Sequence, residues 1–412
     1  MRALLIMLFS LLVVITVLAL RLMGKPQHVD PMDGCTLAQI NTLLPHDVTK
    51  ASKISIYTSS TEAYNNILSD IDKACYHVHL LFHKYEPDAV GQQMGDMLLK
   101  KQQQGVQTRL MYDWLMCLPW GRYYRYLSRR GVSTAAFGKM ELPMVRKRDY
   151  YRNHRKLVVV DGRIAWLGGM NIAEHYIHGL GWGCWRDTMI RIEGPAVSAV
   201  QQVFIVDWYY STGQLLNSPS YFPKLSVANG IPVRIITSGP IGDGEAIMHF
   251  CIQLLDCAKH YIYFQSPYFI PPTPLCEALF HAARRGVDVR VMLPPRGDRG
   301  EVTQWVSRSF FTEALEAGVK IALYQPGFLH AKTIVCDDEV GVVGSCNIDP
   351  RSYLLCEEIA AVIESHDYAC QMKTMFVADE ALSHYISLDQ WRNRPYGHKV
   401  KEHIARLVAS QL

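Results

Sequence analysis

Two short stretches of the sequence place a histidine and a lysine two residues apart at the start of an apolar run. Both follow the spacing H-x-K-x4-D, in His154, Lys156 and Asp161 and again in His330, Lys332 and Asp337. Side chains alternate along a strand, so each histidine shares a face with its lysine while the aspartate points to the other face. We therefore expect the aspartates chiefly to order the hairpin turn that follows, an Asp-Gly turn in the first copy and a looser one in the second.

Each copy is also followed by an asparagine at the same distance. The segments are Gly168-Gly169-Met170-Asn171 and Gly344-Ser345-Cys346-Asn347. A single copy could be a strand with solvated polar ends. Two copies at equivalent places indicate one pocket to which both contribute.

The residue types in this pocket suit a phosphate diester. One imidazole can attack phosphorus, the second can protonate the leaving alcohol, and the ammonium groups can stabilise the charge on the phosphate oxygens. The covalent phosphohistidine that results divides one difficult displacement into two. We predict no metal and no cofactor, since the sequence offers no carboxylate cage for a metal.

The elements that must position these residues alternate between helix and strand. Helical periodicity over 61–74 and 91–104 alternates with strand patterns over 76–85 and 105–113, and the second half repeats this order over 249–269 and 274–294. His154 and His330 stand 176 residues apart, while Gly105 and Gly286 stand 181 apart. The order is typical of an α/β fold, and we predict two similar halves whose mixed, largely parallel sheets are sandwiched by helices and related by a pseudo-twofold axis.

The length and composition of the chain agree with two halves, and an apolar run near the N-terminus predicts a membrane segment. The chain has 412 residues, enough for two cores, and a net charge of +4, too small to suggest a nucleic-acid coat. Residues 3–20 form an uncharged apolar run that fits a transmembrane helix, with a cleavable signal peptide as the alternative. We predict an anchor over 1–24, a linker over 25–48, a first half over 49–216, a connector over 217–230 and a second half over 231–412.

The paired motifs resemble the phospholipase D superfamily, and the softer stretches are similar to those of bacterial cardiolipin synthases. Those stretches are GGMNIAEHY, WRDTMIRIEGPAV, FQSPYFIPP, GFLHAKT, GSCNIDPRSYLLCEE and HIARLVASQL, in that order. The resemblance implies that His154 is the nucleophile and His330 the general acid and then base. It also implies that the lysines hold the phosphate together with Asn171 and Asn347, near Ser345.

The family further places an acidic residue beyond each motif to orient a histidine. Asp187 and Glu358 match those places.

The resemblance implies an activity and a location. The activity is transfer of a phosphatidyl group from one phosphatidylglycerol to another with release of glycerol. The body would lie at a bacterial inner membrane, in contact with the lipid bilayer and not with nucleic acid. The eleven cysteines, an odd number without a CxxC pair, favour a reducing compartment and so the cytoplasmic side of that membrane. A hydrolase that uses water, a membrane-anchored nuclease or phosphodiesterase, and a lipid-binding protein without activity are the alternatives.

Two surface segments have open assignments. The stretch 114–127 interleaves Trp, Tyr and Arg, which suits either the headgroup layer of a membrane or a helix that covers the core. The basic C-terminal stretch 391–407 is more often a solvated helix than one that faces anionic lipid.

Overall fold

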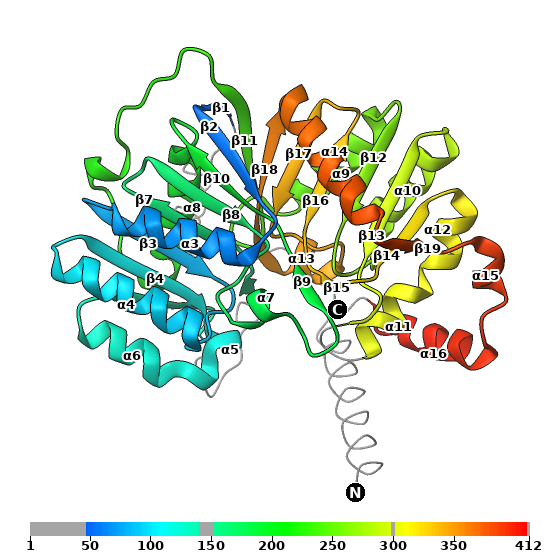
Figure 1. Cartoon of the computed structure of the whole chain (residues 1–412), viewed down its shortest axis with the longest axis horizontal. Helices are drawn as coiled ribbons and strands as arrows, with labels where there is room; N and C mark the ends of the chain where they lie inside the picture. Colours follow the sequence, from blue (N-terminus) through cyan, green and yellow to red (C-terminus); the bar gives the residue numbers. More distant parts are fainter. Residues whose placement is uncertain (1–46, 140–150, 298–300, 410–412) are drawn as a thin grey trace, which may run out of the picture.

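The computed structural model describes residues 47–139, 151–297 and 301–409. It is a mixed α/β fold with two large sheets, one built mainly from each half of the chain (Figure 1). The predicted anchor over 1–24 and nearly all of the linker lie outside the described residues. Within the described ranges, no helix combines the length and the apolar character needed to cross a membrane.

The sheet of the first half is ordered β2-β10-β8-β7-β3-β4-β5. Its strands, in that order, are Lys53–Tyr57, Met189–Glu193, Ile164–Gly168, Lys156–Val160, His77–Phe82, Gln107–Asp113 and Ser133–Phe137. The helices of this half are α3 (Ser60–Asp72), α4 (Ala89–Gln103), α5 (Trp114–Cys117), α6 (Gly121–Arg129), α7 (His175–His178) and α8 (Val197–Thr212), with one-turn segments η1 (Leu118–Trp120) and, in the connector, η3 (Pro219–Tyr221).

The sheet of the second half repeats this order as β11-β18-β17-β16-β12-β13-β14, with β1 added at one edge and β19 at the other. These strands are Ile231–Ser238, Cys356–Glu364, Val340–Gly344, Thr333–Cys336, Tyr261–Gln265, Asp288–Leu293 and Lys320–Tyr324, with β1 at Val48–Ala51 and β19 at Ser383–Tyr385. The helices are α9 (Ala246–Cys257), α10 (Thr273–Arg284), α11 (Glu301–Ser309), α12 (Phe311–Ala317), α13 (Pro350–Leu354), α14 (His366–Glu380), α15 (Leu388–Arg392) and α16 (Tyr396–Arg406).

The strand that follows each histidine divides its side chains between two cores. Leu157 and Val159 of β7 pack into a central core shared by both sheets, α8 and α14, whereas Val158 and Val160 pack into the outer core under α3 and α4. The period of two predicted from the sequence is therefore present. Because the central core takes residues from both halves, the halves are joined by apolar packing as well as by the chain.

The prediction of largely parallel sheets is wrong. Among the described strands of the first sheet, only the β3–β4 and β4–β5 pairs are parallel. In the second sheet the equivalent pairs β12–β13 and β13–β14 are parallel, and the short strand β6 (Arg152–Asn153) adds a parallel pair to β18. The remaining pairs of the two sheets are antiparallel. They include the hairpins β7–β8 and β16–β17, whose strands are joined without a crossover helix.

The prediction of a looser second turn is also wrong. Both hairpins leave three residues between the paired positions Val160–Ile164 and Cys336–Val340. The φ angles of Asp161 and Gly162 are 52° and 62°, and those of Asp337 and Asp338 are 51° and 55°. The second turn therefore has the geometry of the first, because an aspartate adopts the left-handed conformation that glycine adopts there.

Candidate active site

Two short parallel pairs cross between the halves and end at the histidines. Strand β6 pairs with β18 so that Asn153 faces Glu357, and β15 (Gly327–Leu329) pairs with β9 (Cys184–Arg186) so that Leu329 faces Arg186. The next residues along each chain are His154 beside Glu358 and His330 beside Asp187. Backbone hydrogen bonds of 2.9 Å from His154 N to Glu357 O and of 2.7 Å from His330 N to Arg186 O extend these registers.

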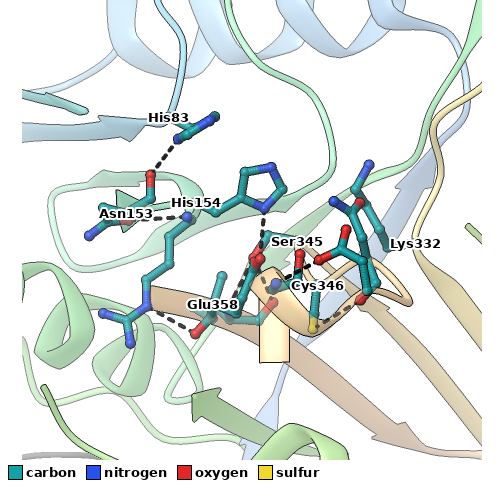
Figure 2. A network of polar contacts seen from close by, with 12 residues as sticks. His83, Asn153, His154, Lys332, Ser345, Cys346 and Glu358 are labelled. Atoms are coloured by element: carbon teal, nitrogen blue, oxygen red, sulfur yellow. Dashed lines mark hydrogen bonds and ion pairs between the residues drawn. The ribbon is translucent and has the colours of Figure 1, made fainter. Parts of the chain in front are cut away.

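Each histidine consequently bonds to a carboxylate from the other half. His154 Nδ1 lies 2.7 Å from Glu358 Oε1, and His330 Nδ1 lies 2.6 Å from Asp187 Oδ2 (Figure 2 shows the first pair). Both carboxylates are fully buried. A carboxylate that accepts from Nδ1 fixes the tautomer, so Nε2 of each neutral ring is left as the basic atom.

The two histidines line one cavity of about 270 Å³. Asn347, Tyr268, Arg351 and His83 also line it. The structure therefore brings together the two motifs that the sequence places 176 residues apart. Most of the residues that line the cavity are polar or charged, and they converge from several elements, which suits a small charged headgroup.

The two lysines lie beneath the histidines and are buried. Each ammonium group donates to the backbone carbonyl of its own histidine, Lys156 to His154 and Lys332 to His330. Burial lowers the pKa of Lys156 to about 7, although Glu358 opposes this shift. The site thus holds two buried ammonium groups and two buried carboxylates. Because they are buried, solvent screens the attraction between them only weakly.

Burial also shifts the two orienting carboxyl groups. It raises the pKa of Glu358 to about 7, against the lowering effect of Lys156, and that of Asp187 to about 6, against the lowering effect of Lys332. Burial disfavours the charged form of each group, so the carboxylates and the lysines depend on one another to stay ionised.

The two halves support their carboxylates differently at one position. The Ser345 hydroxyl donates to Glu358 Oε2, as Figure 2 shows. In the first half Gly169 takes the place of Ser345. It leaves room for the Asp187 carboxylate, since a Cβ atom at Gly169 would lie 2.1 Å from Asp187 Oδ1. The Asp187 Oδ1 atom accepts from the backbone N–H of Thr188 at 2.7 Å.

The two predicted asparagines have different surroundings. Asn171 supports the loop after β3, since its Oδ1 accepts from Lys84 N at 3.0 Å and its Nδ2 donates to Tyr176 Oη at 2.7 Å. Asn347 lines the cavity, and among the described residues its buried Oδ1 has no hydrogen-bond partner. Asn347 therefore offers the cavity an acceptor oxygen that no described group satisfies, whereas the described contacts of Asn171 are structural.

The motif aspartates lie at the far ends of their strands. Asp161 accepts three backbone N–H groups, from Cys75, Tyr76 and His77, at 2.7–2.8 Å. Asp337 accepts from Lys259, His260 and Tyr261 at 2.7–2.9 Å. Each aspartate thus ties its turn to the start of the neighbouring strand, and neither contacts a histidine of the motif in the bonds described.

His83 is a cavity residue that sequence reasoning missed. Its ring centroid lies 4.6 Å from that of His154 at 74°, and its Nδ1 lies 2.8 Å from the carbonyl oxygen of Asn153 (Figure 2). It follows β3, which pairs antiparallel with β7 so that Phe82 faces Lys156. No local pattern indicates this antiparallel register, so His83 has no signal in the sequence.

Comparison with known proteins identifies the family. Residues 67–208 and 251–379 match the sequence profile of a family described as cardiolipin synthase, PLD-like domain. The chain belongs to this family. The resemblance to the phospholipase D superfamily and to cardiolipin synthases is confirmed.

Curated relatives within the cardiolipin synthase family match most of the chain. A protein named cardiolipin synthase from Geobacillus kaustophilus is 36% identical over 374 residues, which cover 89% of this chain and 74% of the relative. The protein named major cardiolipin synthase ClsA from Bacillus subtilis is 36% identical over 366 residues, covering 88% and 76%. The phosphatidylserine synthase of Haemophilus influenzae Rd KW20 superposes with a TM-score of 0.69 at 15% identity, over 92% of this chain and 99% of that one, and supports the fold.

Proposed function

We propose that this protein is a cardiolipin synthase, a phosphatidyltransferase that joins two phosphatidylglycerol molecules and releases glycerol. The observation that carries the proposal is the crossed pair of hydrogen bonds, His154 to Glu358 and His330 to Asp187, at one cavity. Relatives named cardiolipin synthase that align over most of the chain support the choice of substrate.

In the first step His154 Nε2 attacks phosphorus of one phosphatidylglycerol. The bond between phosphorus and the headgroup oxygen breaks, and His330, protonated on Nε2, gives that proton to the departing glycerol. Glu358 stabilises the positive charge that develops on His154, and the two lysines stabilise the phosphate oxygens. The product of this step is a phosphatidyl group on His154.

In the second step His330, now neutral, accepts the proton of a headgroup hydroxyl from the second phosphatidylglycerol. That oxygen attacks phosphorus, the bond from phosphorus to His154 breaks, and cardiolipin leaves. The imidazolium of His330 that forms is stabilised by Asp187, and the enzyme returns to its starting state. Water in place of the second lipid would give phosphatidic acid, which is the hydrolase alternative.

The division of the chain into an anchor, a linker, two halves and a connector is part of the proposal. We infer an anchor over 1–24, a linker over 25–48, halves over 49–216 and 231–412, and a connector over 217–230, with the body at the bacterial inner membrane. The repeated order of strands in the two sheets supports the division into halves.

The test is to incubate the purified full chain with phosphatidylglycerol alone and to identify the lipid products by mass spectrometry. Cardiolipin and glycerol in equal amounts are expected, and His154→Ala should abolish both. His281→Ala, which changes an exposed histidine on α10, is the matched control and should keep full activity. Phosphatidic acid without cardiolipin would identify a hydrolase, and the absence of any lipid turnover would overturn the proposal.

A further inference from the structure

Helix α16 (Tyr396–Arg406) presents a continuous apolar stripe to solvent. Tyr396 is 80% exposed, Val400 39%, Ile404 60% and the capping residue Leu407 65%. Their spacing of four, four and three residues places them on one side of the helix. Single exposed apolar residues are common, but an aligned set of four large ones is typical of a surface that contacts something apolar.

The opposite side of α16 is held firmly against the protein. Glu402 is 2% exposed and lies 3.0 Å from Arg308 Nε and 2.7 Å from Arg394 Nη2. The ring of His398 lies 5.2 Å from that of Trp305, and Ala405 packs against the core of the second half. The apolar stripe therefore faces outward because the other face is fixed, and α16 cannot turn to bury it.

The charges of α16 select the kind of partner. The basic residues Lys399 and Lys401 flank the stripe on its two sides, and Arg406 lies beyond Lys399. The single acidic residue of the helix is Glu402, which is buried against two arginines. Arg406 is ion-paired with Glu313 of α12, so the charge beside the stripe comes from Lys399 and Lys401. The outward side of the helix thus combines apolar side chains with two flanking lysines, the pattern of a helix that lies in the surface of an anionic bilayer.

The position of α16 relative to the cavity fits this reading. Helix α11 packs against α16, and its Thr303 lines the cavity, while its Val302 is 51% exposed. Across the cavity Met116 of α5 lines the wall, next to Leu115, which is 44% exposed. Figure 1 shows α5 on one side and α11 and α16 on the other along the same lower edge of the molecule.

We propose that the stripe of Tyr396, Val400, Ile404 and Leu407 docks onto the surface of an anionic lipid bilayer and turns the active-site cavity toward its lipid substrate. The inference rests on the proposed function for the identity of the substrate, but the docking surface itself is a separate property. It also revises the sequence-based preference for a solvated C-terminal helix.

The direct test is hydrogen–deuterium exchange of the full chain reconstituted into two kinds of bilayer. In bilayers that contain phosphatidylglycerol, amides of α16 should exchange at least fivefold more slowly than in bilayers of phosphatidylcholine alone. Amides of α14, which carries exposed Val377, should exchange equally in both. Equal exchange of α16 in the two bilayers would overturn the proposal.

A paired activity measurement separates docking from chemistry. Val400→Asp/Ile404→Asp should lose about tenfold in rate on phosphatidylglycerol vesicles while keeping its rate on a short-chain phosphatidylglycerol that is dispersed as monomers. Val377→Asp/Leu382→Asp, which adds the same charge at sites 46% and 53% exposed, should lose neither rate. Equal losses on both substrates, or no loss on vesicles, would contradict docking, whereas a wild-type protein inactive on both substrates would contradict the proposed function instead.

The oligomeric state tests whether a second copy of the chain, and not a bilayer, covers the apolar stripe. The molecular mass in detergent should be the same for wild type and Val400→Asp/Ile404→Asp. A change from dimer to monomer in the variant would mean that a second copy covers the stripe and would overturn the proposal.

Discussion

At the scale of single residues, the site depends on groups whose pKa values burial shifts close to neutral pH. Glu358 and Lys156 have pKa values raised and lowered, respectively, to about 7, in both cases mainly by burial. In the proposed mechanism the Glu358 carboxylate is charged when it orients His154 and stabilises the positive charge of that ring, and Lys156 is charged when it binds phosphate. Both conditions hold together only near neutral pH.

The rate of cardiolipin formation is therefore expected to follow a bell-shaped pH profile with its maximum near pH 7. The acid limb reports protonation of Glu358, and the alkaline limb reports loss of the proton from Lys156. In Lys156→Arg, which stays protonated, the alkaline limb should move upward by at least one pH unit even though the maximal rate falls. An unchanged alkaline limb in this variant would show that another group controls it.

Removal of the Glu358 charge should reduce activity and change the pH dependence of stability. Glu358→Gln is expected to lower kcat by about 10- to 100-fold, because the Nδ1 partner of His154 loses its charge. The folded wild type holds the proton of Glu358 up to about pH 7, whereas the unfolded chain releases it near pH 4.3. The raised pKa of Glu358 therefore contributes stability that is fully present below about pH 4.3. This contribution is lost as the pH rises through the folded-state pKa of about 7.

The variant Glu358→Gln should not show this loss of stability with rising pH. Urea unfolding of both proteins at pH 5 and pH 8 measures it, and the wild type should lose more free energy of unfolding between the two pH values, by on the order of 2 kcal/mol. A difference of the opposite sign would mean that Glu358 is ionised throughout.

The motif aspartates are expected to matter for stability and little for chemistry. In Asp161→Asn the amide nitrogen cannot accept hydrogen bonds, so one or more of the three backbone N–H groups at Cys75–His77 loses its acceptor. We expect a loss of about 1–3 kcal/mol in the free energy of unfolding, measured with denaturant, and kcat within about twofold. A variant that folds normally and is as inactive as His154→Ala would contradict this assignment.

At the scale of elements, the short crossing pairs decide whether the histidines meet their carboxylates. Strand β15 begins at Gly327, where a Cβ atom would lie 2.1 Å from the carbonyl oxygen of Cys184 in β9. The two backbones approach closely because glycine has no side chain there. This contact fixes the register that places His330 beside Asp187.

Gly327→Ala should therefore separate β15 from β9 and lower kcat by about 100-fold. The His330–Asp187 bond is lost when the register shifts, while most of the packed core is far from the change. Gly181→Ala, in the loop before β9 and with open space around its Cα, is the control and should keep its activity. The measurement is kcat together with the melting temperature, and a variant with normal kcat would show that the crossing pair tolerates displacement.

At the scale of the whole molecule, the two halves form one folding unit. Strand β1, from the start of the first half, pairs with β11 of the second, and the central core contains side chains from both sheets. A chain cut between the exposed residues Ala228 and Asn229 should be active when the two fragments are expressed together. Each fragment expressed alone should be insoluble and inactive, because its half of the central core is exposed; a soluble fragment would contradict the shared core.

Activity is also expected to persist in a chelator. Within the described residues no three histidine, cysteine or acidic side chains converge in a manner that suits a metal ion. The rate should change by less than about twofold in excess EDTA. Loss of activity that added metal restores would require a metal in the mechanism.

The sequence by itself determined the chemistry and the duplication of this protein. The spacing of His154 and Lys156 predicts their shared face, and the repeat at His330 predicts a second contribution to one pocket, because alternation along a strand is a local property. The same alternation places the aspartates at turns, and the hydrogen bonds of Asp161 and Asp337 support that placement.

Only the tertiary structure decided which carboxylate serves which histidine. Glu358 and His154 are 204 residues apart, and Asp187 and His330 are 143 apart. Their meeting depends on the register of β6 with β18 and of β15 with β9, which no local pattern encodes. The direction of the strands, the position of His83 and the outward stripe of α16 likewise depend on what packs against each element, and packing is settled by the whole chain at once.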